Sequence, residues 1–321
     1  MSDSLNSTFP LKNKKVFIAG HNGMVGSALL RRLSKEDCVC LTIDREMLDL
    51  RNSIEVYDWF KKNKPDVVFF TAAKVGGIYA NKTYPVNFIY DNLVIQNSVI
   101  SAAYYYNVSK LMFLGSSCIY PRNANQPLKE EALMSGFLEP SNEFYAIAKI
   151  AGLKLCQAYR KQYGSDFISV MPTNLYGPRD NFEAENSHVV AALIVKFYDA
   201  ISLGKNKITL WGTGRPLREF MHVDDLADGL VFAMKHYSDE QHINLGTGKE
   251  ISINDFANTL KKITGWEGII EYDSSYPDGT PRKIMDVSRM TGLGWEAKIG
   301  LEQGLKGTYN WYVENFGKVR C

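Results

Sequence analysis

The first half of the chain alternates short hydrophobic runs with longer amphipathic segments, and this alternation constrains the fold more than any other feature. The short runs are rich in β-branched and aromatic residues, whereas the longer segments carry apolar residues at helical spacing. Such alternation predicts parallel strands joined by crossover helices. We therefore expect a doubly wound α/β fold of the Rossmann type. The expected strands are Lys15–Ala19, Val39–Ile43, Val67–Thr71, Lys110–Gly115 and Phe167–Met171, and the expected helices are Met24–Leu33, Ser53–Lys62, Val86–Asn107 and Asn142–Tyr163.

The second half breaks this rhythm after Pro172. Glycine- and proline-containing stretches such as PTNLYGPRD and LWGTGRPLREF separate shorter helical segments there. A chain of 321 residues, 45% of them hydrophobic, is long enough to form two lobes. We expect a dinucleotide-binding domain formed by residues 1–178 and about 213–247. Residues from about 179–212 and 248–321 are expected to form a smaller, interleaved substrate-binding lobe.

Charge and cysteine content narrow the function classes. The formal net charge is only +2, so no global field favours nucleic acid or a membrane surface as a partner. The cysteines show no CxxC pair, which predicts reduced thiols and no zinc site. The polar N-terminal stretch lacks the apolar region of a signal peptide, and we expect a cytoplasmic protein. The cysteines are Cys38, Cys40, Cys118, Cys156 and Cys321.

A glycine-rich segment, GHNGMVG, lies between the first expected strand and the first expected helix. Gly20 would permit a tight turn, Gly23 would let the backbone approach a pyrophosphate, and Gly26 would let the helix pack closely on the strand. The free amides at the start of the helix would bind the phosphate charge. This position predicts dinucleotide binding, although an ordinary strand–helix turn is the alternative.

The end of the second strand bears on which dinucleotide is bound. An acidic residue there usually binds the ribose hydroxyls of NAD, whereas a basic residue accommodates the 2′-phosphate of NADP. This chain has both, as Asp44 and Arg45. The presence of a cofactor is therefore better specified than its identity.

A tyrosine and a lysine form a YxxxK pair within a strongly helical segment. Tyr145 and Lys149 would lie on one face, about one turn apart. A lysine ammonium beside a phenol should lower the pKa of the phenol and let it pass a proton to a ketone. Ser116 and Ser117 lie at the carboxyl edge of the expected sheet, and one of them should hydrogen-bond that carbonyl. YxxxK spacing also arises by chance, and serines at strand ends are often only caps.

Taken together, several motifs closely resemble those of the GDP-L-fucose synthase family. The resemblance covers the chain from about Lys15 to about Phe316. General dehydrogenase motifs do not explain Cys118 together with NSHVV and PDGTPRK. The motifs are GHNGMVG, AAKVGGI, LGSSCIYP, EPSNEFYAIAKIAG, MPTNLYGPRDNF, NSHVV, WGTGRPLREFMHVDD and PDGTPRK.

The resemblance implies an activity and a role for each of five residues. The family converts GDP-4-keto-6-deoxy-D-mannose to GDP-L-fucose by inversion at sugar carbons 3 and 5, followed by NADPH reduction of the 4-ketone. Tyr145 would be the proton donor in that reduction, Lys149 its electrostatic partner, and Ser116 a hydrogen-bond donor to the carbonyl. Cys118 and His188 would be the epimerisation pair, since a thiolate and an imidazole titrate in the required range. Without the resemblance, a packing thiol and a capping or solvated histidine would be the simpler interpretations.

The resemblance also implies which residues bind the cofactor and the GDP-sugar, and these include the residues of the glycine-rich turn discussed above. No metal site is expected. The expected cofactor-binding residues are Gly20, Asn22, Gly23, Met24, Val25, Gly26, Arg45, Asp49, Leu50, Ala72, Lys149, Pro172, Asn174, Leu175 and His188. Among them, Asp49 and Leu50 match the place where relatives hold the adenine, although a solvated loop aspartate is the alternative, and the segment from Pro172 to Leu175 resembles the one that lines the nicotinamide. The expected residues for the GDP-sugar are Ser116, Asn174, Lys196, Trp211, Arg218 and Asp278.

The chain departs from the family at the site for the 2′-phosphate. Relatives often have an arginine where this chain has Asn22, and a further basic residue near Ile43, while Arg45 remains at a matching position. We expect NADP to be preferred, with weaker discrimination against NAD.

Two other functions and one assembly are compatible with the sequence. One rival is another nucleotide-sugar epimerase or dehydratase with tightly bound NAD, and the other is a regulatory binding protein on a degenerate dehydrogenase fold. The helices Val86–Asn107 and Asn142–Tyr163 could pair across a two-fold axis as a four-helix bundle, giving a homodimer as in relatives. The same pattern also fits packing within one subunit.

Overall fold

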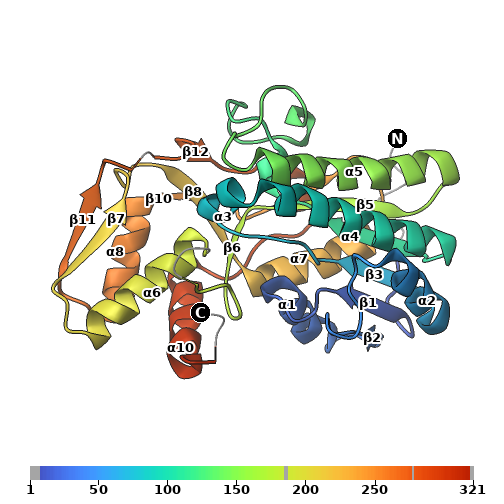
Figure 1. Cartoon of the computed structure of the whole chain (residues 1–321), viewed down its shortest axis with the longest axis horizontal. Helices are drawn as coiled ribbons and strands as arrows, with labels where there is room; N and C mark the ends of the chain where they lie inside the picture. The colour runs from blue at the N-terminus through green and yellow to red at the C-terminus, as the bar shows by residue number, and fades with distance from the viewer. Residues whose placement is uncertain (1–7, 184–186, 277, 319–321) are drawn as a thin grey trace.

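The protein is described by a computed structural model that covers residues 8–183, 187–276 and 278–318. Cys321, the first residues of the NSHVV and PDGTPRK motifs, and the extreme ends of the two predicted lobes lie outside the described residues. The molecule is elongated, with a large parallel sheet and its helices at one end and a smaller group of strands and helices at the other (Figure 1).

A six-stranded sheet forms the centre of the larger end. Its order is β2-β1-β3-β4-β5-β9, and every neighbouring pair is parallel. The order reverses at β1, because β2 lies on one side of it and all later strands on the other. The crevice outside the carboxyl ends of strands at such a reversal is where open α/β sheets bind ligands. The strands are β1 (Lys15–Ala19), β2 (Val39–Leu41), β3 (Val67–Phe70), β4 (Lys110–Leu114), β5 (Phe167–Pro172) and β9 (Ile243–Leu245).

Helices cover both faces of this sheet. Val16 and Ile18 of β1 point into one core, whereas Phe17 and Ala19 point into the other. Burial on both faces explains why the strands are continuous hydrophobic runs. The first core lies under α1 (Met24–Leu33) and α7 (Val223–His236), and the second lies under α2 (Ser53–Asn63), α4 (Pro85–Tyr105) and α5 (Glu143–Tyr163).

The smaller end has its own core and two short sheets. In one sheet β8 lies between β10 and β12 and also pairs with β6, and in the other β7 pairs with β11. Three helices, α6, α8 and α10, pack on one another. The bounds are β6 (Asn174–Tyr176), β7 (Lys207–Trp211), β8 (Leu217–His222), β10 (Glu250–Ser252), β11 (Ile269–Asp273), β12 (Arg282–Lys283), α6 (Val189–Ser202), α8 (Ile253–Thr264) and α10 (Leu301–Asn315).

Short helical segments connect these elements. They are α3 (Ile78–Thr83), which precedes α4, α9 (Ser288–Gly292), which packs beside β9, and the two 3₁₀ turns η1 (Ser117–Ile119) and η2 (Glu130–Ala132).

The predicted doubly wound α/β architecture is confirmed, and the predicted elements differ from the observed ones only at their ends. β2 ends at Leu41 and not at Ile43, since only Val39–Leu41 pair with β1. α4 ends at Tyr105 and not at Asn107, whose positive φ of 55° is incompatible with a continuing right-handed helix. The segment that contains α7 and β9 belongs to the large sheet, while β8 pairs within the smaller end. The division into two lobes at the stated boundaries stays a prediction.

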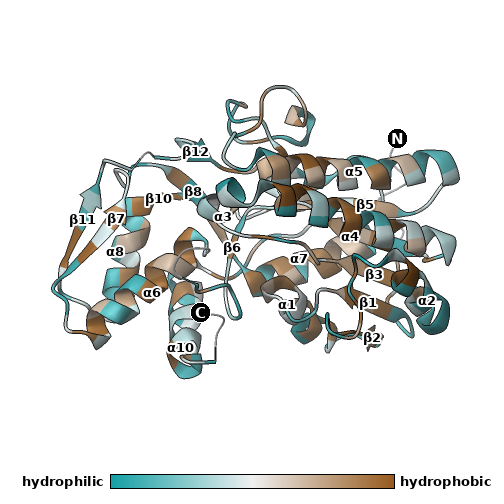
Figure 2. Cartoon of the chain, viewed as in Figure 1, coloured by the Kyte–Doolittle hydropathy of each residue, from teal (hydrophilic) through white to brown (hydrophobic). Residues whose placement is uncertain are grey.

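Hydropathy follows this layered arrangement. Figure 2 shows hydrophobic residues along the strands of the large sheet and on helix faces, with hydrophilic residues at helix ends and loops. Within the described ranges, no helix combines the length and the apolar character that crossing a membrane would require.

Candidate active site

The turn after β1 and the first turn of α1 each have one position that only glycine fits. Gly20 has a φ of 95°, and a Cβ there would lie 2.9 Å from backbone atoms of Ala72, just after β3. A Cβ on Gly26 would lie 2.2 Å from the carbonyl oxygen of Gly20. The turn therefore packs tightly against β3 and against its own helix, as the backbone of a pyrophosphate site does.

The start of α1 is open to an anion. Gly23 is the N-cap, no side chain caps the helix, and its first turn has no acidic residue. The first amides of a helix, here those of Met24, Val25 and Gly26, have no intrahelical acceptor. These amides and the helix dipole are what a phosphate group requires.

Asn22, an expected cofactor ligand, is bonded to Asp44. Its Nδ2 donates to Asp44 Oδ1 at 2.6 Å, and His21 Nε2 lies 3.3 Å from the same oxygen. Arg45 is exposed. The acidic residue after β2 is thus tied to the glycine-rich turn, while the basic residue next to it is accessible.

The expected adenine site is organised by an ion pair. Arg51 Nη2 donates to Asp49 Oδ2 at 2.6 Å, and this contact lowers the pKa of the Asp49 carboxyl. Leu50 is partly buried against the core between the sheet and α2. Asp49 is therefore held ionised next to an apolar side chain, and adenine binding here stays a prediction.

Four of the five expected catalytic residues meet at the carboxyl end of β4. Lys149 Nζ donates to the carbonyl of Leu114 at 2.8 Å and lies 5.8 Å from the centroid of the Tyr145 ring. Ser116 is close enough to the Tyr145 hydroxyl to act on its pKa, and the Ser116 Oγ accepts from the backbone amide of Cys118 at 3.4 Å. β4 thus presents a hydroxyl and a thiol, and α5 presents a phenol and an ammonium.

Burial sets the protonation of this group. Desolvation lowers the pKa of Lys149 to about 8 and raises that of Cys118. We expected Lys149 to lower the pKa of Tyr145, but the net direction is upward. Burial and the neighbouring Cys118 outweigh the hydrogen bond from Ser116, which acts in the opposite direction. The phenol therefore keeps its proton, as a proton donor must.

His188, the fifth expected catalytic residue, lies at the start of α6. It is the N-cap residue, but its side chain makes no capping bond and is 49% exposed, which excludes the capping interpretation. Its Nδ1 lies 4.0 Å from Asp180 Oδ1. This carboxylate raises the pKa of His188. Among the described residues, His188 forms this contact with Asp180 and no hydrogen bond or ion pair with the other four expected catalytic residues.

The segment expected to line the nicotinamide continues from β5 into β6. Pro172 ends β5, and Leu175 packs against the core under α1 and α7. Asn174 Nδ2 donates to the backbone carbonyl of Glu219 in β8 at 2.8 Å. This bond joins the large sheet to the smaller end close to the site.

Four of the six residues expected to hold the GDP-sugar, namely Lys196, Trp211, Arg218 and Asp278, lie at the smaller end, whereas Ser116 and Asn174 lie near the large sheet. Lys196 Nζ lies 5.6 Å from the centroid of the Trp211 ring, and Trp211 is 65% exposed, so it is not a core residue. The Asp278 carboxylate accepts from the backbone amide and hydroxyl of Thr213 at 2.8 and 2.6 Å. Its charge also acts on Arg218, whose pKa burial lowers. Two cations and an exposed aromatic ring are thus available to a nucleoside diphosphate.

Comparison with known proteins places the sequence of this chain in a family. The profile described as the NAD dependent epimerase/dehydratase family matches residues 16–246. GDP-L-fucose synthase 1 from Arabidopsis thaliana is 53% identical over 95% of this chain and 94% of its own length. The chain belongs to the GDP-L-fucose synthase family. The GDP-L-fucose synthase from Escherichia coli (strain K12) is 49% identical over 97% of this chain and 100% of its own.

A solved structure of the family has the same fold. The crystal structure of a GDP-L-fucose synthetase from Naegleria fowleri, described as bound to NADP, superimposes with a TM-score of 0.92. It is 30% identical, and the match covers 100% of both chains. Within the residues described, no group of three or more His, Cys, Asp or Glu side chains is placed to hold a metal ion.

Lys283 is a residue of the family motif PDGTPRK that the sequence analysis did not assign. It lies in β12, in register with Arg218 of β8. Its charge acts on Cys118, where it opposes the rise in the thiol pKa that burial causes, as the charge of Lys149 also does. Burial in turn lowers the pKa of Lys283. The motif was part of the resemblance, so the signal was present, but the distance along the chain between Lys283 and Cys118 concealed their electrostatic interaction.

Glu219 anchors the strand that carries Lys283. It is fully buried; one carboxylate oxygen accepts from the amides of Thr247 and Gly248 at 2.5 and 2.9 Å, and the other accepts from Met285 at 2.7 Å. The carboxylate therefore holds β12 against the turn after β9. It lies next to Arg218 in PLREF, where only Arg218 was assigned a role.

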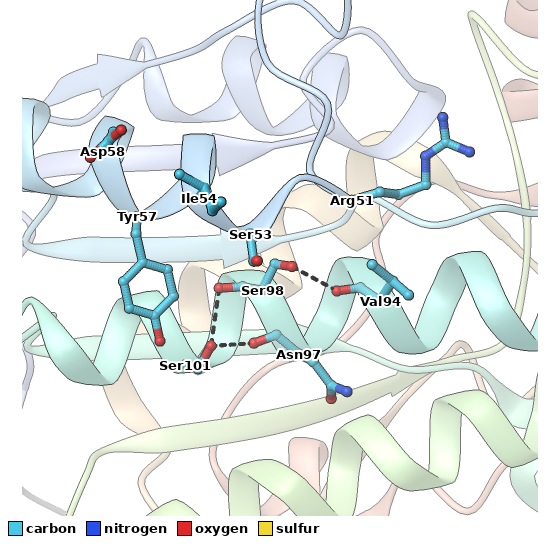
Figure 3. A pocket seen from close by; sticks show the side chains of 9 residues that line it. All are labelled: Arg51, Ser53, Ile54, Tyr57, Asp58, Val94, Asn97, Ser98 and Ser101. Atoms are coloured by element: carbon cyan, nitrogen blue, oxygen red, sulfur yellow. Dashed lines mark hydrogen bonds between the residues drawn. The ribbon is translucent and has the colours of Figure 1, made fainter.

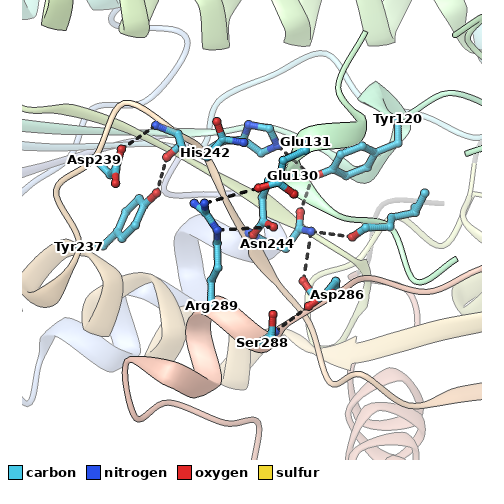
Figure 4. Close-up of polar contacts among 12 residues, drawn as sticks. Tyr120, Glu130, Glu131, Tyr237, Asp239, His242, Asn244, Asp286, Ser288 and Arg289 are labelled. Carbon is cyan, nitrogen blue, oxygen red and sulfur yellow. Dashed lines mark hydrogen bonds and ion pairs between the residues drawn. The ribbon is translucent and has the colours of Figure 1, made fainter. Parts of the chain in front are cut away.

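A buried polar network supports the segment that follows Cys118 (Figure 4). Tyr120 Oη lies 2.9 Å from His242 Nε2 and donates to Asn244 Oδ1 at 2.5 Å. Asn244 Nδ2 donates to the carbonyl of Leu128 at 2.9 Å, and its backbone amide donates to Glu130 Oε1 at 2.9 Å. The network ties the chain on both sides of the loop after Cys118 to β9, the edge strand of the large sheet.

A groove of about 640 Å³ lies elsewhere, between α2 and α4. Figure 3 shows Ser53, Tyr57 and Ser98 among the side chains that line it. None of the expected catalytic or ligand-binding residues lines this groove, so it is not part of the candidate site.

Proposed function

We propose that this protein is an NADPH-dependent epimerase/reductase that converts GDP-4-keto-6-deoxy-D-mannose to GDP-L-fucose. The observation that carries the proposal is the grouping of Ser116, Cys118, Tyr145 and Lys149 at the carboxyl end of β4. Such a group combines a proton donor for a ketone with a thiol that can remove a proton next to it. Membership of the GDP-L-fucose synthase family supplies the substrate class.

The dinucleotide fits the turn before α1. The tight packing at Gly20 and Gly26 and the uncapped helix start suit a pyrophosphate. When bound, the nicotinamide supplies the hydride for ketone reduction. Asn174 and Leu175 would line its pocket, and Lys149 would hold its ribose.

The inversions come first in the proposed mechanism. Ser116 hydrogen-bonds the sugar carbonyl, which acidifies the protons on the adjacent carbons because the resulting charge moves to oxygen. Cys118, as thiolate, removes such a proton, and His188 returns one to the opposite face. Burial raises the pKa of Cys118, so this step depends on the charges of Lys149 and Lys283, which act in the other direction.

The reduction then uses the phenol. Tyr145 donates its proton to the carbonyl oxygen, and Lys149 stabilises the phenolate that remains. The upward shift in the pKa of Tyr145 keeps the donor protonated until that moment.

The cofactor preference rests on few residues. We propose that NADP is favoured through Arg45, which is exposed beside the turn. Asn22 bonds to Asp44 and supplies no positive charge, so discrimination against NAD should be weak. A ratio of catalytic efficiencies that strongly favours NADH would overturn this preference.

The substrate would bind across the two ends of the molecule. Lys196 and Arg218 are placed to neutralise the diphosphate, and Trp211 to pack against the nucleoside or sugar. Asp278 would position the adjoining loop through Thr213.

We further propose a cytoplasmic homodimer formed by α4 and α5. These helices pack on each other and expose apolar side chains outward, with Val86 70%, Tyr90 63% and Phe144 44% exposed. Covering these residues with the same pair from a second copy would give a four-helix bundle. A monomeric mass in solution at micromolar concentration would exclude the dimer.

The decisive assay follows NADPH oxidation with GDP-4-keto-6-deoxy-D-mannose and identifies the sugar by NMR. Oxidation with GDP-L-fucose as product supports the proposal in full. An uninverted 6-deoxy product would retain the reductase and remove the roles of Cys118 and His188. Absence of oxidation, or tightly bound NAD in the purified protein, would favour a different nucleotide-sugar enzyme.

A further inference from the structure

Asp180 is a buried carboxylate beside the exposed imidazole of His188. It lies in the loop between β6 and α6, and its side chain is 5% exposed, against 49% for His188. Its Oδ1 lies 4.0 Å from His188 Nδ1. Among the described residues, Asp180 is also the charged group that shifts the pKa of His188.

Local structure does not account for both oxygens of this carboxylate. Oδ1 accepts from the backbone amide of Asn181 at 2.8 Å, a turn bond that an asparagine side chain would make equally well. Oδ2 is buried and has no hydrogen-bond partner in the described part of the chain. Burying a carboxylate with an unpaired oxygen is costly unless a positive group or a donor compensates it. In the described part of the chain, the imidazole of His188, whose Nδ1 lies 4.0 Å from the other oxygen of this carboxylate, is a neighbouring group that can be both.

We propose that Asp180 is a positioning residue for His188, holding its Nδ1–H so that Nε2 faces the sugar. This inference rests on the proposed function of the site, because it assigns His188 the task of returning a proton to carbon. A carboxylate on one ring nitrogen fixes both the tautomer and the orientation of the ring, as in other histidine–carboxylate pairs. The 4.0 Å separation closes to a hydrogen bond with a small movement, and such contacts often tighten only when substrate is bound.

The proton balance assigns the two faces of the sugar. The Cys118 thiolate takes a proton from the carbon next to the ketone and becomes a thiol, while the electron pair of that bond moves to the carbonyl oxygen. The imidazolium of His188 then gives its Nε2 proton to the same carbon from the opposite face, and the carbonyl re-forms. His188 ends neutral with Nδ1–H still directed at Asp180, and exchange of protons with water restores both groups.

The test is Asp180→Asn, which keeps the turn bond to Asn181 but removes the charge. NMR titration of the five histidines in the ligand-free protein, with the His188 signal assigned by a His188→Gln variant, reports the pairing without any turnover. We expect the pKa of His188 to fall in Asp180→Asn. Asp199→Asn makes the same aspartate-to-asparagine substitution within α6 and is the control. It should leave the pKa of His188 unchanged.

The second measurement is solvent deuterium incorporation at C3 and C5 of the substrate, compared with reduction at C4. We expect Asp180→Asn to slow deuterium incorporation by about 10- to 100-fold, the size of effect that follows when a metal-binding histidine loses its hydrogen-bond partner. The share of uninverted product should rise, KM should change little, and Asp180→Glu should recover part of the rate.

The outcomes separate this inference from the function on which it rests. A lowered pKa in a protein that turns over no GDP-keto-sugar would keep the pairing and remove the proposed function. An unchanged pKa together with unchanged deuterium incorporation would overturn the inference. If Asp180→Asn does not fold, Asp180→Glu carries the same two measurements, and its His188 pKa must remain above the ordinary value.

Discussion

Adding one methyl group to the glycine-rich turn should separate cofactor binding from folding. In Gly26→Ala the new Cβ would lie 2.2 Å from Gly20 O and 2.6 Å from His21 Cα, both of them backbone atoms. Ordinary contact requires a separation of 3.4 Å or more, so the turn must move by more than 1 Å. Gly20 O also accepts from the Gly23 amide at 3.1 Å, and this bond cannot survive such a shift unchanged.

The magnitudes follow from these contacts. Overpacking costs about 1–3 kcal/mol, and alanine regains about 1 kcal/mol over glycine within a helix, so the free energy of unfolding should fall by about 0–2 kcal/mol. A displaced turn loses one charge-assisted bond from its amides to the phosphates, worth about 1.5–3 kcal/mol. NADPH affinity should therefore fall by about 10- to 100-fold.

Titration of NADPH by fluorescence and chemical denaturation of the ligand-free protein measure the two quantities. Gly307→Ala is the matched control, because Gly307 is exposed within α10 and a Cβ there meets nothing within 4 Å. It should raise the free energy of unfolding by up to about 1 kcal/mol and leave NADPH affinity unchanged. If Gly26→Ala binds NADPH within two-fold of the parent protein, the assignment of the turn to the pyrophosphate is refuted.

Three further predictions concern charged groups. The pKa of Lys149 is lowered to about 8, so kcat/KM for ketone reduction should decline as the pH rises through 8. Lys149→Arg should move this decline to higher pH. The free energy of unfolding should rise between pH 8 and 10.5, because the unfolded chain binds the lysine proton more tightly than the folded chain in that range. In Glu219→Gln an NH₂ group replaces one carboxylate oxygen, so a buried backbone amide such as that of Met285 loses its acceptor. The free energy of unfolding, measured by chemical denaturation, should fall by about 1–3 kcal/mol. Glu250→Gln, which loses the exposed ion pair with Arg282, is the control and should lower it by less than about 1 kcal/mol. Lys283→Met should slow the alkylation of Cys118 by iodoacetamide at a given pH, because one of the cations that favour the thiolate is lost. Arg282→Met, the neighbouring position on β12, is the control. An equal effect in Arg282→Met would contradict a specific effect of Lys283 on the thiol.

The fold was predictable because its signals are local. A strand buried on both faces is a continuous hydrophobic run, and the helices between such strands repeat their apolar residues at helical spacing. The element ends were less accurate, since Ile43 and Asn107 depend on strand pairing and on one backbone angle. Neither the strand pairing nor the backbone angle can be read from the hydropathy of neighbouring residues.

The candidate site was predictable where function and sequence spacing coincide. The glycine-rich turn and the YxxxK pair each lie within a few residues, so their geometry follows from a turn or a helix. Lys283, Glu219 and Asp180 were missed, although each lies in a motif already noted. The roles proposed for them depend on interactions with Cys118, Met285 and His188 that only the folded chain creates.

The proposed mechanism requires one pocket to support two proton transfers with opposite requirements. In that mechanism inversion uses Cys118 as a base, so the thiol must lose its proton, whereas reduction uses Tyr145 as a donor that keeps its proton until the carbonyl oxygen requires it. Burial raises the pKa of both groups, and the charges of Lys149 and Lys283 oppose that rise at Cys118. Lys149 also serves the reduction in the proposed mechanism, whereas Lys283 acts on the inversion step. Weakening the charge at position 283 should slow inversion before it slows reduction, and the share of uninverted product would measure that difference directly.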